Sequence, residues 1–222
     1  MNKYDVWNER YRPMTLDDIV GQPLMINKLK QTISTGNFTN FMLSGPNGTG
    51  KTSTAYAIAS KVLNGHLDGG NFKEINASEQ KWRSINVVDA VIMPFLKTMP
   101  LVPSGPFKIL LLEEADNLTK DAQKAMRRPF ELYNNRTRII MTVNYPDNII
   151  DAIQSRFTRY DFEPIEETSM INRLKEICQE ENIRFTDSQY RNIVKTVNGD
   201  MRKAVNIMQN MQVDTSDLGG IF

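Results

Sequence analysis

Residues 45–53 read Gly45, Pro46, Asn47, Gly48, Thr49, Gly50, Lys51, Thr52 and Ser53, and this stretch decides the fold. An apolar run, Phe41 to Leu43, precedes it, and an apolar-periodic segment, Ala55 to Val62, follows it. The pattern predicts a strand, a glycine-rich loop and a helix in that order. Because such a loop points backbone N–H groups and a helix N-terminus at an anion, we expect a phosphate-binding loop. A glycine-rich turn that merely joins strand to helix is the alternative.

The loop predicts binding of ATP with Mg²⁺. Its eight-residue pattern is that of the P-loop, in which backbone N–H groups surround the phosphates. We expect residues 45–53 to contact the nucleotide, with Lys51 reaching the β- and γ-phosphates. The Thr52 hydroxyl is expected to ligate Mg²⁺.

Two carboxylates, Glu113 and Glu114, directly follow another apolar run, Ile109 to Leu112. In a P-loop protein we expect the first to hold Mg²⁺ and the second to orient the attacking water as a catalytic residue. Most such proteins have aspartate in the first place. Glutamate is one methylene longer and can crowd an ion that requires near-octahedral geometry, so the rate of hydrolysis depends on Glu113. A solvated acidic turn is the alternative interpretation.

The fold class follows from four short apolar runs, the other two being Phe72 to Ile75 and Ile139 to Val143. They read as continuous apolar strands separated by helical segments, which predicts an α/β fold with a parallel sheet covered by helices on both faces. Past Pro164 three apolar stripes at helical spacing predict a small all-helical domain that begins near residue 165. The stripes are Met170, Leu174, Ile177 and Cys178; Tyr190, Ile193, Val194 and Val197; and Met201, Ala204, Val205, Met208 and Met211.

Composition excludes several classes of function. The 222 residues carry 27 basic and 26 acidic side chains, so any nucleic-acid contact must be local. A single cysteine, Cys178, and a single histidine, His66, argue against disulfides, zinc sites and Ser-His catalysis. No leader and no run of about 20 apolar residues is seen, so we expect a soluble intracellular protein with no membrane partner.

With these motifs in place, the chain resembles, nearly end to end, the small subunits of replication factor C and related archaeal and viral clamp loaders. The resemblance implies an AAA+ nucleotide-binding core over residues 1–164 and a helical lid domain over residues 165–222. It rests on Trp7 to Pro13, Leu16 to Gln22, Leu118 to Arg128, Thr142 to Asn144, Ser155 to Phe157 and Gly199 to Ala204.

The resemblance also implies roles for further site residues. Asn8 and Val20 would contact the base, and Asn144, at the sensor 1 position, would hydrogen-bond the γ-phosphate or the attacking water. Arg156 would be an arginine finger acting in trans on the neighbouring subunit's ATP, and Arg202, at the sensor 2 position, would lie over the phosphates. From the residues alone, Asn144 at the end of a strand would be only a turn former.

Two positions are implied in DNA binding or in its coupling to the ATP site, namely Arg83 and Gln123. Lys81 and Trp82 look like a two-residue insertion before Arg83, which leaves the register of DNA contacts there open. Gln123 lies in a basic segment, and from the residues alone such a segment is more often a solvated helix face than a DNA contact. Pro129 departs from the family pattern and removes an N–H from that predicted helix.

The function implied is ATP-driven loading of a sliding clamp onto primer-template DNA during replication. The partners would be the clamp, DNA contacted through its backbone, and other subunits in a homo- or hetero-oligomeric ring; the cell compartment would be a nucleus, a prokaryotic cytoplasm or a virus-infected host cell. The family's collar domain normally follows the lid, and with an end at Phe222 we expect it to be absent. One alternative is a nucleotide-binding structural subunit with poor hydrolysis, and another is a protein-remodelling AAA+ ATPase unrelated to DNA.

Overall fold

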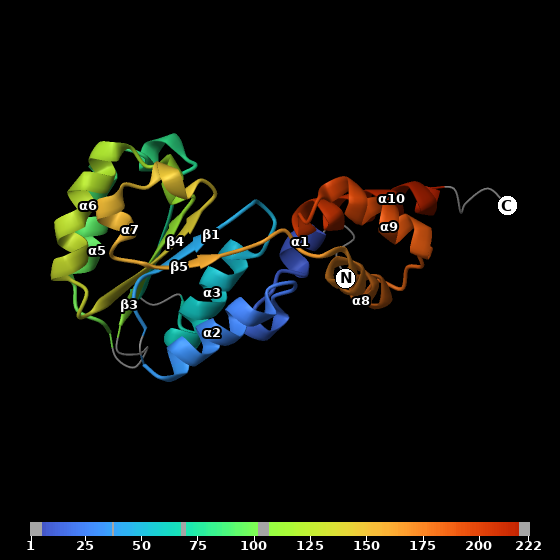
Figure 1. The fold of residues 1–222 in the computed structure, drawn as a ribbon, viewed down its shortest axis with the longest axis horizontal. Coiled ribbons are helices and arrows are strands. Elements are labelled where there is room, and N and C mark those ends of the chain that lie inside the picture. Colours follow the sequence, from blue (N-terminus) through green and yellow to red (C-terminus); the bar gives the residue numbers. More distant parts are fainter. Residues whose placement is uncertain (1–5, 37, 68–69, 102–106, 218–222) are drawn as a thin grey trace.

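The computed structural model describes residues 6–36, 38–67, 70–101 and 107–217 (Figure 1). The strands in these ranges are β1 Phe41–Ser44, β2 Phe72–Asn76, β3 Lys108–Glu113, β4 Thr137–Val143 and β5 Thr158–Asp161. The α-helices are α1 Trp7–Arg10, α2 Pro23–Ser34, α3 Lys51–Val62, α4 Ile85–Val87, α5 Met93–Lys97, α6 Lys120–Leu132, α7 Asp151–Gln154, α8 Glu167–Glu180, α9 Asp187–Val197 and α10 Met201–Asp217. Within the described residues, no helix combines the length and apolarity needed to cross a membrane.

The strands form one parallel sheet in the order β2-β3-β4-β1-β5. The predicted α/β fold with a parallel sheet is confirmed, and all four predicted strands are present. The edge strand β5 was not predicted. Tyr160 is its one buried side chain, so Thr158 to Asp161 lacks the continuous apolar run that marks an inner strand.

Successive strand side chains alternate between two buried clusters, one on each face of the sheet. Met42 and Leu110 belong to the cluster that includes side chains of α5, α6 and α7. Phe41 and Leu111 belong to the cluster that includes side chains of α2 and α3. Figure 1 shows these two sets of helices on opposite sides of the strands. Burial on both faces explains why the inner strands read as unbroken apolar runs.

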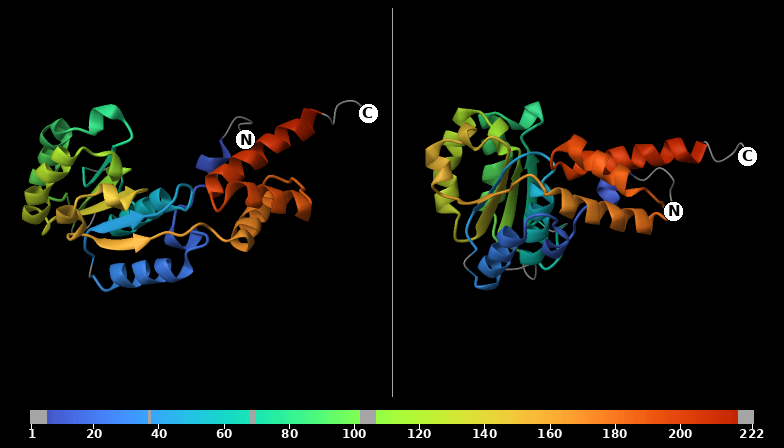
Figure 2. Two further views of the ribbon diagram at one scale, coloured as in Figure 1. Left: turned by 45° about the horizontal axis from the view of Figure 1, so that its top comes forward. Right: turned by 45° about the vertical axis from the view of Figure 1, so that its right-hand side comes forward.

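The helices α8, α9 and α10 form a separate bundle with a core of its own. The three predicted apolar stripes lie in these helices and supply most of that core. Figure 2 shows the bundle beside the sheet, joined to it by the segment after β5. Residues 1–5 and 218–222, at the outer ends of the two predicted domains, lie outside the described residues.

The N-terminal segment, residues 7–11, packs on the bundle rather than on the sheet. Trp7 of α1 is 3% exposed and belongs to the core of the bundle. Its ring meets that of Tyr11 edge-on, and the Tyr11 hydroxyl and the Arg10 guanidinium both donate to the carboxylate of Glu181. A segment at one end of the chain therefore joins a domain near the other end.

We predict that Trp7→Ala lowers the free energy of unfolding by about 3–5 kcal/mol, because it leaves a large cavity in a small core. Denaturant unfolding followed by circular dichroism at 222 nm measures the change. The control is Trp82→Ala, which removes the other tryptophan from a half-buried position and is expected to cost less. An unchanged free energy of unfolding in Trp7→Ala would mean that the N-terminal segment does not contribute to the bundle's core.

Candidate nucleotide-binding site

The loop of residues 45–50 connects β1 to α3. At two of its glycines the surrounding atoms leave no room for a side chain. A Cβ on Gly45, where φ is 145°, would lie 2.3 Å from the carbonyl oxygen of Phe162. A Cβ on Gly48, where φ is 72°, would lie 1.8 Å from Oδ1 of Asp200. The backbone therefore lies against its neighbours directly, and α3 begins at Lys51 with its N-terminus at the loop.

Lys51 extends along the inside of the loop. Its Nζ donates to the carbonyl oxygens of Gly45 and Pro46, both at 2.6 Å. Burial lowers the pKa of Lys51 to about 8, an effect that the charge of Asp116 opposes and that of Arg202 reinforces. Phosphate oxygens are stronger acceptors for an ammonium group than carbonyls are, so the loop suits an anionic ligand.

Glu113 ends β3 and is 9% exposed. Its Oε1 is buried and has no hydrogen-bond partner among the described residues, while Oε2 accepts weakly from Asn76 Nδ2 at 3.4 Å. Burial raises the pKa of Glu113 to about 7; a hydrogen bond from the Thr52 hydroxyl lowers it and the neighbouring Glu74 raises it. An unpartnered carboxylate oxygen beside a hydroxyl fits the predicted Mg²⁺ ligand pair, since Mg²⁺ takes oxygen ligands.

Glu114 has left-handed backbone geometry, with φ of 49°. Such a conformation is uncommon for a residue with a side chain and persists where the surroundings hold it. Here the Glu114 N–H donates to Thr142 Oγ1 at 3.0 Å, and its carboxylate accepts from Asn117 Nδ2 at 3.2 Å. The turn directs Glu114 into the same cavity as Glu113.

A cavity of about 500 Å³ lies between the loop, the N-terminal segment and the helical bundle. Asn8 Nδ2 donates to Asn206 Oδ1 across it, and the Trp7 N–H donates to Gln209 Oε1 at 3.1 Å. The predicted site residues that line it are Asn8, Val20, Gly48, Thr49, Gly50, Thr52, Ser53, Glu113, Glu114 and Arg202. Residues distant in sequence therefore meet around one space large enough for a nucleotide.

A second cavity of about 560 Å³ lies on the other side of the loop. Gly45, Pro46, Asn47 and Asn144 line it, so the structure places Asn144 beside the loop but not in the first cavity. The Asn144 N–H donates to Asp116 Oδ1 at 3.3 Å, and the Tyr145 N–H to Asp116 Oδ2 at 3.2 Å. Asp116 thus fixes the end of β4 that carries Asn144.

Several residues around the first cavity were missed by the sequence analysis. Arg173 and Asn206 line it, as does Asn76, whose Cα is in register with Glu113 across the β2–β3 pair. Asn206 lies one helical turn beyond Arg202 on α10, a spacing that places both on one face, so that signal was available. No comparable signal marks Arg173, because it comes from α8 and reaches the cavity only through the packing of the bundle.

Arg83 and Gln123 line neither cavity and bond to their own chain. The Arg83 guanidinium donates to the carbonyls of Ala77, at 3.0 Å, and Ser78. Gln123 is 1% exposed; it donates to Asn148 O at 3.0 Å and accepts from the Ile150 N–H at 2.8 Å. Gln123 therefore ties α6 to the loop that leads into α7.

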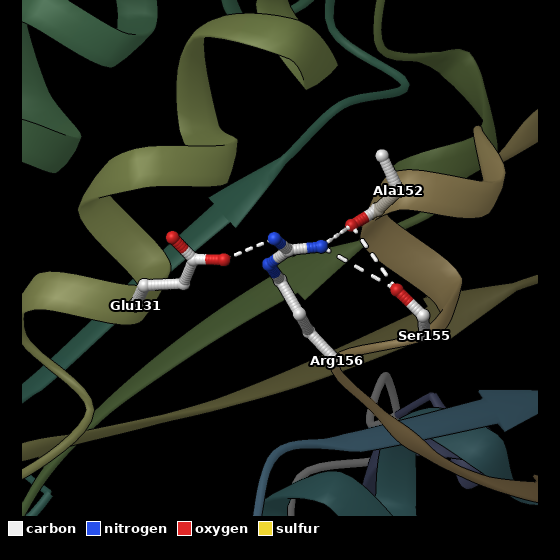
Figure 3. A network of polar contacts seen from close by, with 4 residues as sticks. All are labelled: Glu131, Ala152, Ser155 and Arg156. Carbon is white, nitrogen blue, oxygen red and sulfur yellow. Dashed lines mark hydrogen bonds and ion pairs between the residues drawn. The ribbon is translucent and has the colours of Figure 1, made fainter.

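Arg156 follows α7 and is likewise outside the first cavity. Its guanidinium donates to the carboxylate of Glu131 on α6 and to the carbonyl of Ala152, as Figure 3 shows. The side chain remains 25% exposed. The structure thus separates this predicted residue from the chain's own phosphate loop.

Residues 41–164 match the ATPase family associated with various cellular activities (AAA).

The chain belongs to the AAA family.

Residues 172–213 match the RCF1/5-like AAA+ ATPase lid domain, which covers most of α8 and all of α9 in this AAA chain and extends into α10. The chain is similar to the replication factor C small subunit of Archaeoglobus fulgidus, with 43% identity over 94% of this chain and 64% of the relative. The corresponding subunit of Aeropyrum pernix is 41% identical over 92% of this chain and 62% of the relative. The resemblance inferred from the motifs is confirmed, and the chain spans less than two thirds of either relative.

Among solved structures, the Thermotoga maritima RuvB Holliday junction branch migration motor has a TM-score of 0.75 to this AAA chain. Sequence identity is 17%, over 94% of this chain and 67% of that one. At this identity the likeness confirms the AAA+ fold and says nothing about the ligand or partner of this chain.

We predict that the affinity of the AAA chain's nucleotide complex for Mg²⁺ rises about tenfold from about pH 6 to about pH 8. Glu113 must be ionised to hold the metal, and with its pKa raised to about 7 it is mostly protonated at the lower pH and mostly ionised at the higher. Mg²⁺ titrations of a bound fluorescent ATP analogue at both pH values measure this. The Glu113→Gln variant controls for protonation of the nucleotide itself, and an identical pH dependence in both proteins would exclude Glu113 as a ligand.

Proposed function

We propose that this AAA chain is a small subunit of a clamp loader, an ATPase that uses ATP to place a sliding clamp on primer-template DNA. The observation that carries the proposal is the position of Arg156. It lies outside the chain's own phosphate cavity yet remains partly exposed, so a γ-phosphate that Arg156 contacts belongs to another subunit's nucleotide. Similarity to replication factor C small subunits over nearly the whole chain supports the same conclusion.

Different residues of the loop and the cavity bind the phosphates, the metal and the base. The backbone of residues 45–52 and the Lys51 ammonium hold the phosphates, and Thr52 with Glu113 holds the metal. Bound Mg²⁺ neutralises charge on the phosphate oxygens. Glu114 orients the attacking water, Asn8 and Val20 contact the base, and Arg202 moves with the bundle over the phosphates.

Coupling to DNA is proposed to run through α6. Gln123 is buried and holds the loop before α7, so a change in α6 reaches the segment that carries Arg156. The Arg83 guanidinium donates to the Ala77 and Ser78 carbonyls, so its proposed role is to hold the shape of the segment that follows β2. Binding through the DNA backbone requires no base specificity and weakens steeply with salt.

A second candidate function is a structural subunit that binds nucleotide and hydrolyses it poorly. The observation in its favour is Glu113, because burial disfavours its ionised form. Its added methylene can also crowd an ion that requires octahedral geometry. Both functions require nucleotide binding, so only the rate of ATP hydrolysis distinguishes them.

We predict that ATPase activity with primed DNA and the cognate clamp falls by about 10³-fold or more in Arg156→Ala, since a finger in trans contributes about 10³–10⁵. Glu114→Gln is expected to lower the rate by about 10²–10⁴ while ATP still binds. Steady-state phosphate release measures both, with Arg191→Ala on α9 as the control for loss of an exposed arginine. Tight ATP binding without turnover in the wild type would favour the structural subunit, and turnover indifferent to DNA would favour a protein-remodelling ATPase.

Mixing the two inactive variants separates action in trans from action in cis. A Glu114→Gln chain retains Arg156 and an Arg156→Ala chain retains its own cavity, so mixed assemblies contain some complete sites. We expect the mixture to regain part of the wild-type ATPase rate. A mixture as inactive as its components would show that Arg156 does not complete a neighbour's site.

A further inference from the structure

Both terminal nitrogens of the Arg156 guanidinium contact their own subunit. Its Nη2 donates to Glu131 Oε1, and its Nη1 donates to the Ala152 carbonyl and more weakly to Ser155 Oγ at 3.4 Å (Figure 3). Its Nε is buried and has no acceptor within the part of the chain that the structure describes. A phosphate that binds through both terminal nitrogens therefore has to displace these contacts.

The seat of Arg156 is built from two helices that pack closely. The ring of Phe157 meets that of Phe130 on α6 edge-on, with centroids 6.1 Å apart. The Arg156 N–H donates to Ile153 O of α7 at 3.0 Å. These contacts fix the backbone position of Arg156. The Glu131 carboxylate is 56% exposed, so it pairs with the guanidinium but is not part of the core.

We infer that Glu131 is a positioning residue that holds the Arg156 guanidinium on its own subunit until a neighbouring subunit's nucleotide displaces it. The inference rests on the proposed function, because it gives the finger a resting state. In this exchange the Arg156 guanidinium leaves the Glu131 carboxylate and binds a phosphate, which carries a greater negative charge. A phosphate is within reach only after a neighbouring subunit with bound nucleotide has docked. Assembly and ATP binding then become coupled through one ion pair.

The ion pair is weak enough to be exchanged. Both partners are partly exposed, 25% for Arg156 and 56% for Glu131, and such pairs contribute little because water and salt screen them. Removing the carboxylate should therefore shift the docking equilibrium two- to five-fold, which corresponds to about 0.4–1 kcal/mol. Effects on the folding of the chain should be smaller, since the Phe130–Phe157 contact remains.

The first test measures ATPase rate per subunit as a function of subunit concentration, with primed DNA and clamp present. Glu131→Gln is expected to reach half its maximal rate at a two- to five-fold lower concentration than wild type, with the same maximal rate. Raising the salt from about 50 to about 500 mM should abolish this difference, because salt screens the ion pair. Asp187→Asn, which removes another exposed carboxylate, paired with Lys175 on the bundle, should behave as wild type.

The second test follows Arg156 in the free subunit and does not depend on hydrolysis. In a chain labelled with ¹⁵N-arginine, the Nε–H signal that disappears in Arg156→Ala belongs to this residue. Its hydrogen exchange should be two- to five-fold faster in Glu131→Gln, since the buried Nε meets water only when the guanidinium leaves its seat. Unchanged exchange would overturn the inference.

The outcomes distinguish this inference from the function on which it rests. An Arg156→Ala variant as active as wild type would overturn the proposed function. An inactive Arg156→Ala variant, together with a Glu131→Gln variant that matches wild type or needs a higher concentration, would overturn only the holding role of Glu131.

Discussion

The close approach of backbone to backbone at the phosphate loop is the constraint on which the structure depends. Gly45 lies against the carbonyl of Phe162 beyond β5, and its N–H donates to Val143 O at the end of β4. The Gly48 carbonyl accepts from the N–H of Met201, where α10 begins. The loop is therefore the point where sheet and helical bundle meet. A side chain at Gly45 would collide with Phe162 beyond β5. One at Gly48 would collide with Asp200, which directly precedes α10.

Burial gives the cavity its electrostatic character. It moves Lys51 and Glu113 toward their neutral forms, one with its pKa lowered to about 8 and the other with its pKa raised to about 7. A polyanion beside Lys51 and a cation beside Glu113 would reverse both shifts. The two groups are thus arranged so that a nucleotide and its metal stabilise each other's sites.

Helix α6 links the surface expected to face DNA with the residue expected to reach the neighbour. Gln123, near its start, holds the loop that enters α7, and Glu131, near its end, holds Arg156. Pro129 lies inside the helix, which continues past it to Leu132, so both contacts belong to one element. A rigid element with a bond at each end can transmit a small displacement.

The phosphate loop, the four strands β1 to β4 and the apolar stripes of the bundle could be predicted from the sequence. Each depends on residues that are neighbours along the chain, so a local pattern reveals it. The sequence did not reveal β5, whose one buried side chain leaves no periodic signal, or the roles of Asp116, Arg173 and Asn206. Those residues approach the site from separate elements, and Trp7 joins the far domain for the same reason. Only tertiary packing decides such contacts, since burial and hydrogen bonding between distant segments are absent from any local pattern.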